Sequence, residues 1–434
     1  MNENDLKRYT VILGGGSGVL FQPLDENITY ILTAKHVLYK DIHDDRGQKI
    51  GEELIDKVDF SYSSDQSNKI KFEIKKGKNY FEHDDADAAI LILNENLGYN
   101  EIFIDERTTS YSGFNLTGYP NIKRETDDKY DKYVIADVNS YNDNLIALRL
   151  VVNHLDHEQI TGFSGGGIIK ANGDSLLLAG IQSKTPIGNC NGEIQATPAK
   201  IFEEIVASNN LSKLLPNFFS KIDSLLSSII EFNGTIPSLI PKLQGALRIQ
   251  ARKIKCELKD IYSSKLLNNS SIRGTSINSK YFWTCFLEYA LIISLLEDND
   301  FNEELLGVMN RKRKFIFSDS SKNIYDLYSD ILLFASENIE DQCQILVATT
   351  TLPTTDKTRR MPTSKVPKNI ANVDDNETID RIILRNKIKE IIHLKAIELD
   401  CINKNDELLD QFDLHQFEDI LTEIKRLVHE FFSN

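Results

Sequence analysis

Residues 30–38 read Tyr-Ile-Leu-Thr-Ala-Lys-His-Val-Leu, which places a histidine, His36, just after a short apolar run. Two later segments share this design. Residues 87–93 (Asp-Ala-Ala-Ile-Leu-Ile-Leu) open on an aspartate, and residues 162–169 (Gly-Phe-Ser-Gly-Gly-Gly-Ile-Ile) hold a serine in a glycine-rich turn. Short apolar runs bounded in this way are typical of buried strands. The pattern predicts His36, Asp87 and Ser164 at strand ends.

Similar short runs recur through the first 200 residues, separated by clusters of Asp, Asn, Gly and Ser. Many short strands at this spacing indicate a β-sandwich or β-barrel. A helix is expected at 198–207, where Ile201, Ile205 and Val206 share one face. The segments expected to be strands are 9–13, 18–21, 29–33, 70–74, 88–93, 145–152, 167–170 and 176–182.

From about residue 211 the apolar residues recur three or four positions apart, which indicates amphipathic helices. We therefore expect a multidomain α+β chain, with a β-rich domain over 1–208 and a mainly α-helical domain over 209–434. Three prolines between 349 and 375 predict a long surface loop. The expected helical stretches are 218–232, 240–262, 281–296, 324–339, 378–399 and a final stripe of Leu414, Phe417, Leu421, Ile424, Val428 and Phe431.

The three polar residues suit nucleophilic catalysis. A serine hydroxyl needs a base to remove its proton, and histidine titrates near neutrality. A buried carboxylate orients the histidine and stabilises its charged form. In this scheme Ser164 is the nucleophile, His36 the base and Asp87 the orienting acid. The glycine two residues before Ser164 lets the N–H groups of Gly162 and Ser164 converge as an oxyanion hole.

Simpler interpretations exist for each residue. His36 could be a core histidine, Ser164 part of a structural glycine turn, and Asp84 or Asp85 could replace Asp87, although only Asp87 directly precedes the apolar run. The acid-rich loops with His43 and His83 could suggest a metal site, but such loops are more often simply solvated. We expect no metal and no cofactor.

In the order His, Asp, Ser, these segments resemble the trypsin-like (chymotrypsin-fold) serine proteases over residues 9–205. The run 15–20, Gly-Gly-Ser-Gly-Val-Leu, with 31–37, is similar to the bacterial heat-shock-type, intracellular members. The resemblance implies two six-stranded Greek-key barrels with the triad at their junction, endopeptidase activity on protein substrates, and no cofactor. It also implies that the strand containing Ser183 lines the bound substrate.

The chain departs from this family at two positions. Secreted zymogens carry Asp just before the nucleophile, where this chain has Phe163. Activation by N-terminal cleavage is therefore not expected. The position six residues before the serine, which often floors the specificity pocket, is Glu158, with His157 and Gln159 as alternatives. A carboxylate there favours Lys or Arg in the substrate.

Composition bears on location and partners. The formal net charge is −15, which disfavours direct binding to nucleic acid or to an anionic membrane. The first residues are polar, no apolar run is long enough to span a bilayer, and the five cysteines are scattered. We expect a cytoplasmic protein without a disulfide framework or zinc site.

The second half resembles the C-terminal domains of effectors in bacterial three-component (Lamassu-like) defence systems with an ABC-type ATPase. The segments that carry this resemblance are 281–296, 305–318 and 325–347. It implies a regulated protease effector in antiphage defence, with ATPase and accessory subunits as partners. The alternatives are a protease-fold binding module that has lost catalysis and a general cytosolic quality-control protease.

Overall fold

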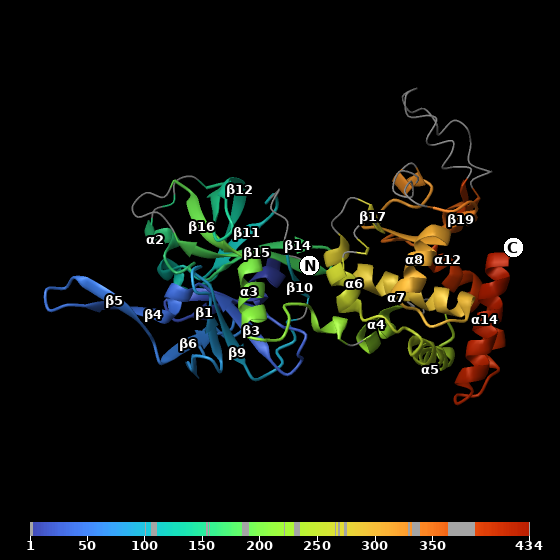
Figure 1. The fold of residues 1–434 in the computed structure, drawn as a ribbon, viewed down its shortest axis with the longest axis horizontal. Coiled ribbons are helices and arrows are strands. Elements are labelled where there is room, and N and C mark those ends of the chain that lie inside the picture. Colours follow the sequence, from blue (N-terminus) through green and yellow to red (C-terminus); the bar gives the residue numbers. More distant parts are fainter. Residues whose placement is uncertain are drawn as a thin grey trace, which may run out of the picture. The chain divides into compact units, whose positions relative to one another are not determined.

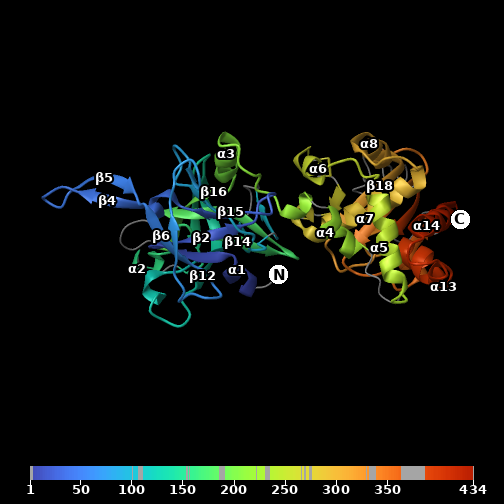
Figure 2. The ribbon, with the colours of Figure 1, turned by 90° about the horizontal axis from the view of Figure 1, so that it is seen from below.

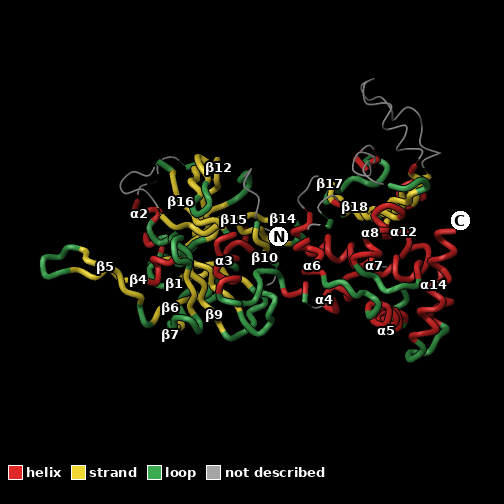
Figure 3. Tube along the Cα trace, viewed as in Figure 1, coloured by secondary structure: helices red, strands yellow, loops and turns green. Residues whose placement is uncertain are grey.

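The fold is described from a computed structural model. It describes residues 3–99, 101–105, 111–152, 155, 157–184, 191–220, 222–229, 235–264, 266–267, 270–272, 276–328, 330–331, 339–362 and 387–433. The chain forms two compact units, Met1–Asn217 and Phe218–Asn434. Strands fill the first unit and helices are prominent in the second, as the yellow and red segments of Figure 3 show. The expected multidomain α+β fold is confirmed.

The first unit contains two seven-stranded sheets. Every segment expected to be a strand contains one. In the first sheet the order is β7-β6-β1-β2-β3-β9-β8, with all pairs antiparallel. Its strands are β1 (Thr10–Leu13), β2 (Gly16–Phe21), β3 (Thr29–Thr33), β6 (Lys57–Ser61), β7 (Ile70–Glu73), β8 (Tyr80–Glu82) and β9 (Ala89–Leu93).

The second sheet closes into a six-stranded barrel, because β15 pairs with both β14 and β16. The order around the barrel is β14-β11-β12-β13-β16-β15, and β10 adds a parallel strand outside β15. Its strands are β10 (Ile102–Ile104), β11 (Asn115–Gly118), β12 (Asp131–Tyr141), β13 (Ile146–Leu150), β14 (Gly167–Asn172), β15 (Ser175–Lys184) and β16 (Glu193–Pro198).

Both sheets follow the same winding. In each, three consecutive strands pair in order and the fourth returns to pair with the first, giving β6-β1-β2-β3 and β14-β11-β12-β13. This spatial order, 4-1-2-3, defines the Greek key. Among the described strands the first sheet stays open between β7 and β8, so it forms a half-barrel beside the closed one.

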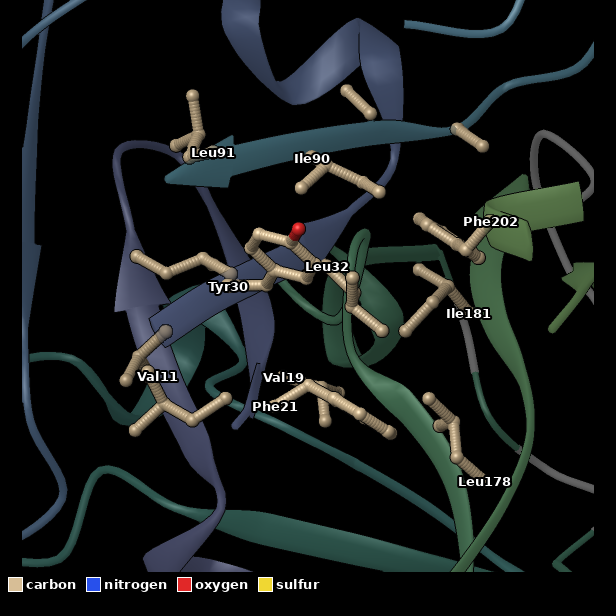
Figure 4. Packing of buried hydrophobic residues seen from close by; sticks show 14 of the residues in the cluster. Val11, Val19, Phe21, Tyr30, Leu32, Ile90, Leu91, Leu178, Ile181 and Phe202 are labelled. Atoms are coloured by element: carbon tan, nitrogen blue, oxygen red, sulfur yellow. The ribbon is translucent and has the colours of Figure 1, made fainter. Parts of the chain in front are cut away.

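One hydrophobic core unites the two sheets of this unit. Tyr30 and Leu32 of β3 pack with Ile181 of β15, and Phe202 closes the cluster from helix α3 (Lys200–Ser208), as Figure 4 shows. These side chains are almost completely buried. Fully burying a large apolar side chain stabilises by about 1.5–3 kcal/mol. The shared core therefore fixes the sheets against each other.

A β-hairpin leaves the half-barrel directly after His36. It consists of β4 (Tyr39–His43) and β5 (Lys49–Leu54), which pair only with each other. Figures 1 and 2 show this hairpin projecting from the half-barrel in both views. Its exposed residues include Ile50. The short helical elements of the unit are α1 (Glu3–Arg8), η1 (Lys35–Leu38), η2 (Asn121–Lys123) and α2 (His157–Ile160).

The second unit contains a five-stranded sheet that the sequence did not predict. Its order is β17-β18-β19-β21-β20, with parallel pairing except between β20 and β21. The strands are β17 (Ser271–Ile272), β18 (Arg313–Ser318), β19 (Cys343–Thr349), β20 (Arg360–Pro362) and β21 (Ile388–His393). The helices are α4 (Ile222–Ile229), α5 (Leu239–Ala251), α6 (Leu258–Ser264), α7 (Lys280–Glu297), α8 (Glu303–Lys312), α10 (Asp356–Arg359), α12 (Leu394–Ile397), α13 (Asp406–Asp410) and α14 (Phe417–Ser433), with short 3₁₀ and π turns.

The expected helix over 378–399 is wrong at its centre, where β21 lies fully inside the sheet. Residues 378–386 lie outside the described part of the chain, as does most of 332–339 in the expected helix 324–339. The expected loop after 349 contains α10 and β20. The helices expected at 281–296 and at the C-terminus are confirmed by α7 and α14.

The core of the second unit encloses charged side chains. Lys395 Nζ lies 3.0 Å from Glu398 Oε2 and 3.5 Å from Glu288 Oε2, and it donates to the main-chain oxygen of Ile229 at 2.8 Å. All three charged residues are buried. Burial would lower the pKa of Lys395, but the two carboxylates hold it above its usual value. The ammonium therefore stays charged in the core.

Candidate functional site

His36 and Asp87 meet because β3 and β9 are paired. In that ladder Thr33, the last residue of β3, lies opposite Ala89, the first of β9. His36 follows β3 in η1, and Asp87 precedes β9. The Asp87 carboxylate accepts two hydrogen bonds from His36: the main-chain N–H reaches Oδ1 at 3.0 Å, and ring Nδ1 reaches Oδ2 at 2.7 Å. This contact leaves ring Nε2 as the proton acceptor.

Asp87 is shielded, whereas His36 is open to solvent. Their side chains are 17% and 42% exposed. Burial alone would raise the pKa of Asp87, but the hydrogen bond and the charge of His36 outweigh it and lower the pKa. From β16, the Thr197 hydroxyl donates to the main-chain oxygen of Asp87 at 3.0 Å. The carboxylate is thus ionised at neutral pH and bound by His36, while the main chain of Asp87 is held from the second sheet.

Ser164 occupies a tight turn that needs glycine at its third position. The N–H of Gly166 donates to the oxygen of Phe163 at 2.6 Å, which closes a four-residue turn. Gly165 has φ +86°, the value that a type II turn requires there. Ser164 is partly exposed between the buried Phe163 and Gly165. The turn therefore presents the hydroxyl on an otherwise buried loop.

The same turn orients two main-chain amides. The oxygen of Thr161 accepts from Asn121 N–H at 2.7 Å, and the oxygen of Phe163 accepts from Gly166. Because C=O and N–H point in opposite directions in a trans peptide, the N–H groups of Gly162 and Ser164 point away from these contacts. Neither has an acceptor among the described residues. The arrangement leaves two donors free beside the Ser164 hydroxyl.

Ser17, on β2, joins the two sheets beneath this turn, and the sequence analysis assigned it no role. Its main-chain N–H donates to the oxygen of Ser164 at 2.7 Å, and its hydroxyl donates to the oxygen of Gly162 at 2.8 Å. The hydroxyl also accepts from Tyr119 N–H at 2.9 Å. Ser17 is completely buried. It therefore ties down the two carbonyls that alternate with the free amides.

Arg124 is a second supporting residue that the sequence analysis missed. Its guanidinium donates to the oxygens of Gly14 and Gly16, at 2.6 and 3.0 Å. A Cβ on Gly16 would lie 2.5 Å from the Ser164 oxygen and 2.8 Å from Val37 Cγ2. Gly16 is therefore wedged between the serine turn and the residue after His36. In the sequence, only the Gly-Ser-Gly run at residues 16–18 indicated that another part of the chain packs closely against Gly16.

These contacts join His36 to Asp87, and they place the main chain of Ser164 and the side chain of Val37 close to Gly16. No hydrogen bond joins His36 to the Ser164 hydroxyl, although both residues are described. Such contacts are often long before substrate binds. The arrangement offers a base oriented by an acid, and a serine hydroxyl on a turn with two free amides. This is the set of groups that acyl transfer requires.

The residues predicted for specificity are placed differently. Glu158 is exposed in the first turn of α2, and its role in substrate choice stays a prediction. Ser183 is buried on β15, where its hydroxyl donates to the Gln195 oxygen at 3.3 Å. Phe163 packs against Tyr133 with ring centroids 5.4 Å apart. A buried aromatic ring here leaves no charge to bind a new N-terminus.

Metal ligands and reactive thiols are the other chemistry that the described residues could offer. They contain no group of three or more His, Cys, Asp or Glu side chains that could hold a metal ion. Burial raises the pKa of the Cys343 thiol to about 11, so it is protonated at neutral pH and a poor nucleophile. No helix in the described part of the chain is long and apolar enough to cross a membrane.

Comparison with known families adds one result. Residues 196–403 match the model of CTD4, the C-terminal domain 4 of the ABC-three component (ABC-3C) systems. The second half of the chain thus resembles a domain of these systems. None of the curated proteins compared with the chain matches it.

The CTD4 match agrees with the expected resemblance of the second half to a three-component system. It begins in β16, includes α3, and continues through the sheet of the second unit. ABC-3C systems have several components, and a match to one of their domains is consistent with partner subunits. The match does not reach His36, Asp87 or Ser164, so it is independent of the candidate site.

Proposed function

We propose that the first unit is a serine endopeptidase, with Ser164 as nucleophile, His36 as general base and Asp87 as the orienting acid. The observation that carries this proposal is the combination of the His36–Asp87 hydrogen bond with the N–H groups of Gly162 and Ser164, which have no acceptor among the described residues. A structural glycine turn has no need of an oriented histidine beside it.

In the proposed reaction, the Ser164 oxygen attacks the carbonyl carbon of a peptide bond while His36 Nε2 takes the hydroxyl proton. The oxyanion that forms is stabilised by the N–H groups of Gly162 and Ser164. His36 then gives its proton to the leaving amine, which leaves an acyl group on Ser164. Water activated by His36 releases that group. Asp87 keeps its negative charge throughout and stabilises the charged imidazole.

Turnover of a protein substrate tests this activity. Unfolded casein is incubated with the full chain, with Ser164→Ala, and with Ser208→Ala as a control at an exposed serine of α3. New peptide termini, read by mass spectrometry, should appear with wild type and Ser208→Ala only. Equal cleavage by Ser164→Ala would contradict the proposal. Enrichment of Lys or Arg before the cut would support a role for Glu158.

The CTD4 match supports a second part of the proposal. In it, this protease is an effector that other subunits of an ABC-3C system control, and it serves antiphage defence. An unrestrained endopeptidase would damage the cell that makes it. The test is co-purification with an ATPase subunit of an ABC-3C system from the same cell, followed by a comparison of casein cleavage by the chain alone and in the complex. Cleavage should differ between the two. Failure to associate, with high activity of the lone chain, would favour a quality-control protease.

A protease-fold binding module remains the alternative from another class. It requires the hydroxyl of Ser164 to be inert despite its surroundings. Binding of a protein partner that is equally tight for wild type and Ser164→Ala, without any cleavage, would distinguish it from the enzyme.

A further inference from the structure

The loop that carries Asp87 is folded around the ring of His83. This ring accepts two main-chain hydrogen bonds at Nδ1, from Asp85 N–H at 3.2 Å and Ala86 N–H at 2.9 Å. The loop closes through His83 N–H to the Ala88 oxygen at 3.0 Å. Asp87 lies between these contacts, so its carboxylate direction depends on the turn that the ring organises.

The contacts also fix which ring nitrogen carries the proton. An atom that accepts two N–H donors holds no proton, so the proton of the neutral ring is on Nε2. That nitrogen lies 3.2 Å from Glu204 Oε2, on helix α3, which packs against β9. In this form the ring donates to Glu204 and accepts from the loop.

The contacts of the two ring nitrogens contribute unequally to holding the loop. Glu204 is 54% exposed, and exposed polar pairs contribute little. The side chain of His83 is only 17% exposed, and Nδ1 serves two amides of the loop. Lys35 also holds this loop, because its ammonium donates to the main-chain oxygen of His83 at 2.9 Å. The loop therefore depends on the Nδ1 acceptor and much less on Glu204.

We propose that His83 is a positioning residue for the reaction: its Nδ1 builds the loop that holds Asp87 against His36. This inference rests on the proposed serine endopeptidase. His83 is not proposed to touch the substrate or the reacting atoms. It acts through Asp87, and Glu204 only accepts a hydrogen bond from Nε2 on the other side of the ring.

A matched pair of amide substitutions tests the claim. In His83→Asn the side-chain oxygen stands as many bonds from the main chain as Nδ1 does, and Asn commonly accepts from the amides that follow it. In His83→Gln the added methylene carries the amide past that position. His43→Gln, at an exposed histidine of the β4–β5 hairpin, is the control.

The first readout is the rate at which a fluorophosphonate labels Ser164 in the full chain. The rate should stay near wild type for His83→Asn, Glu204→Gln and His43→Gln, and fall about 10- to 100-fold for His83→Gln, because small displacements of a triad member are costly. Wild-type labelling of His83→Gln, or equal slowing of both His83 variants, would overturn the proposal.

The second readout is the low-field proton NMR signal of the hydrogen between His36 Nδ1 and Asp87, with thermal unfolding as a check on the fold. The signal should persist in His83→Asn and disappear from His83→Gln while both remain folded. If wild type shows the signal but never labels, the proposed protease fails while the role of His83 stands. Retention of the signal in His83→Gln would refute the positioning role.

Discussion

The main chain of Ser17 binds the main chain of Ser164: the N–H of Ser17, on β2 of the half-barrel, donates to the carbonyl oxygen of Ser164 at 2.7 Å. The two residues are 147 positions apart in sequence. Because the Ser17 hydroxyl also holds Gly162, one buried residue of the half-barrel sets the backbone of the loop that carries the candidate nucleophile.

Replacing Ser17 by alanine should weaken both the fold and the site. The substitution leaves the Gly162 oxygen and Tyr119 N–H without their partner in a buried place, which costs about 1–3 kcal/mol. It also frees the loop that orients the two amides, so labelling of Ser164 by a fluorophosphonate should slow about tenfold or more. Ser208→Ala is the control, and a labelling rate equal to its rate would count against the role of Ser17.

Gly165→Ala should be much more damaging than an ordinary glycine replacement. A Cβ at Gly165 would lie 2.0 Å from the Ser17 oxygen and 2.2 Å from Thr33 Oγ1. Gly173 also has positive φ, at +59°, but a Cβ there meets nothing within 4 Å. Gly173→Ala thus measures backbone strain alone, about 1–2 kcal/mol. Calorimetry should show a loss above about 4 kcal/mol for Gly165→Ala, and equal losses for the two would refute the clash.

Stability of the second unit should fall in mild acid because of His393. Burial and the charge of Lys395 lower the pKa of His393 to about 4. Its ring accepts from Lys395 N–H at Nδ1 and contacts Thr349 Oγ1 through Nε2, at 3.1 Å each. In the unfolded chain the pKa is about 6.5, so the unfolded state binds the proton first as pH falls. The stability is complete above pH 6.5 and is lost progressively down to about pH 4.

The loss from this group between those limits is roughly 3 kcal/mol. Trp283 is the single tryptophan and is buried in this unit, so its fluorescence follows the unfolding in urea. His393→Gln should show a shallower pH dependence than wild type. His429→Gln, at an exposed histidine of α14, should match wild type. A pH dependence that is unchanged in His393→Gln would contradict the assignment.

Lys395→Met should destabilise the second unit by about 3–5 kcal/mol, because it leaves Glu288 and Glu398 buried without their cation. Lys404, whose side chain is 62% exposed, pairs with Asp400 on the surface. Lys404→Met is the matched control and should cost less than about 1 kcal/mol. The same Trp283 signal measures both variants. Similar small losses would show that the buried cluster contributes little.

Much of the first unit could be predicted because its signals are local. The apolar runs that end at Thr33 and begin at Ala89 carry their own strand boundaries, and His36 and Asp87 stand beside them. The contacts that complete the site are not local. Arg124 reaches Gly14 and Gly16 over more than 100 positions, and Thr197 reaches Asp87 over 110. No local sequence pattern indicates that residues so far apart in the chain form hydrogen bonds.

The sheet of the second unit could not be predicted for a different reason. Parallel strands buried on both faces form continuous apolar runs, which cannot be told from buried helices by periodicity. The burial pattern of β19 shows this, since all seven of its residues are buried. The apolar residues of β21 are spaced as in a helix, and this spacing continues into α12. The sequence therefore predicted one helix over both elements. Pairing with distant strands, not local pattern, decided their conformation.

The most direct measurement for the central claim is the mass of the intact chain after reaction with a fluorophosphonate, with peptide mapping of the modified residue. We expect one phosphonyl group per chain, located on Ser164, and none on Ser164→Ala. A folded wild-type chain that stays unmodified, or one that is modified at another residue, would contradict an assembled triad and oxyanion hole at this site.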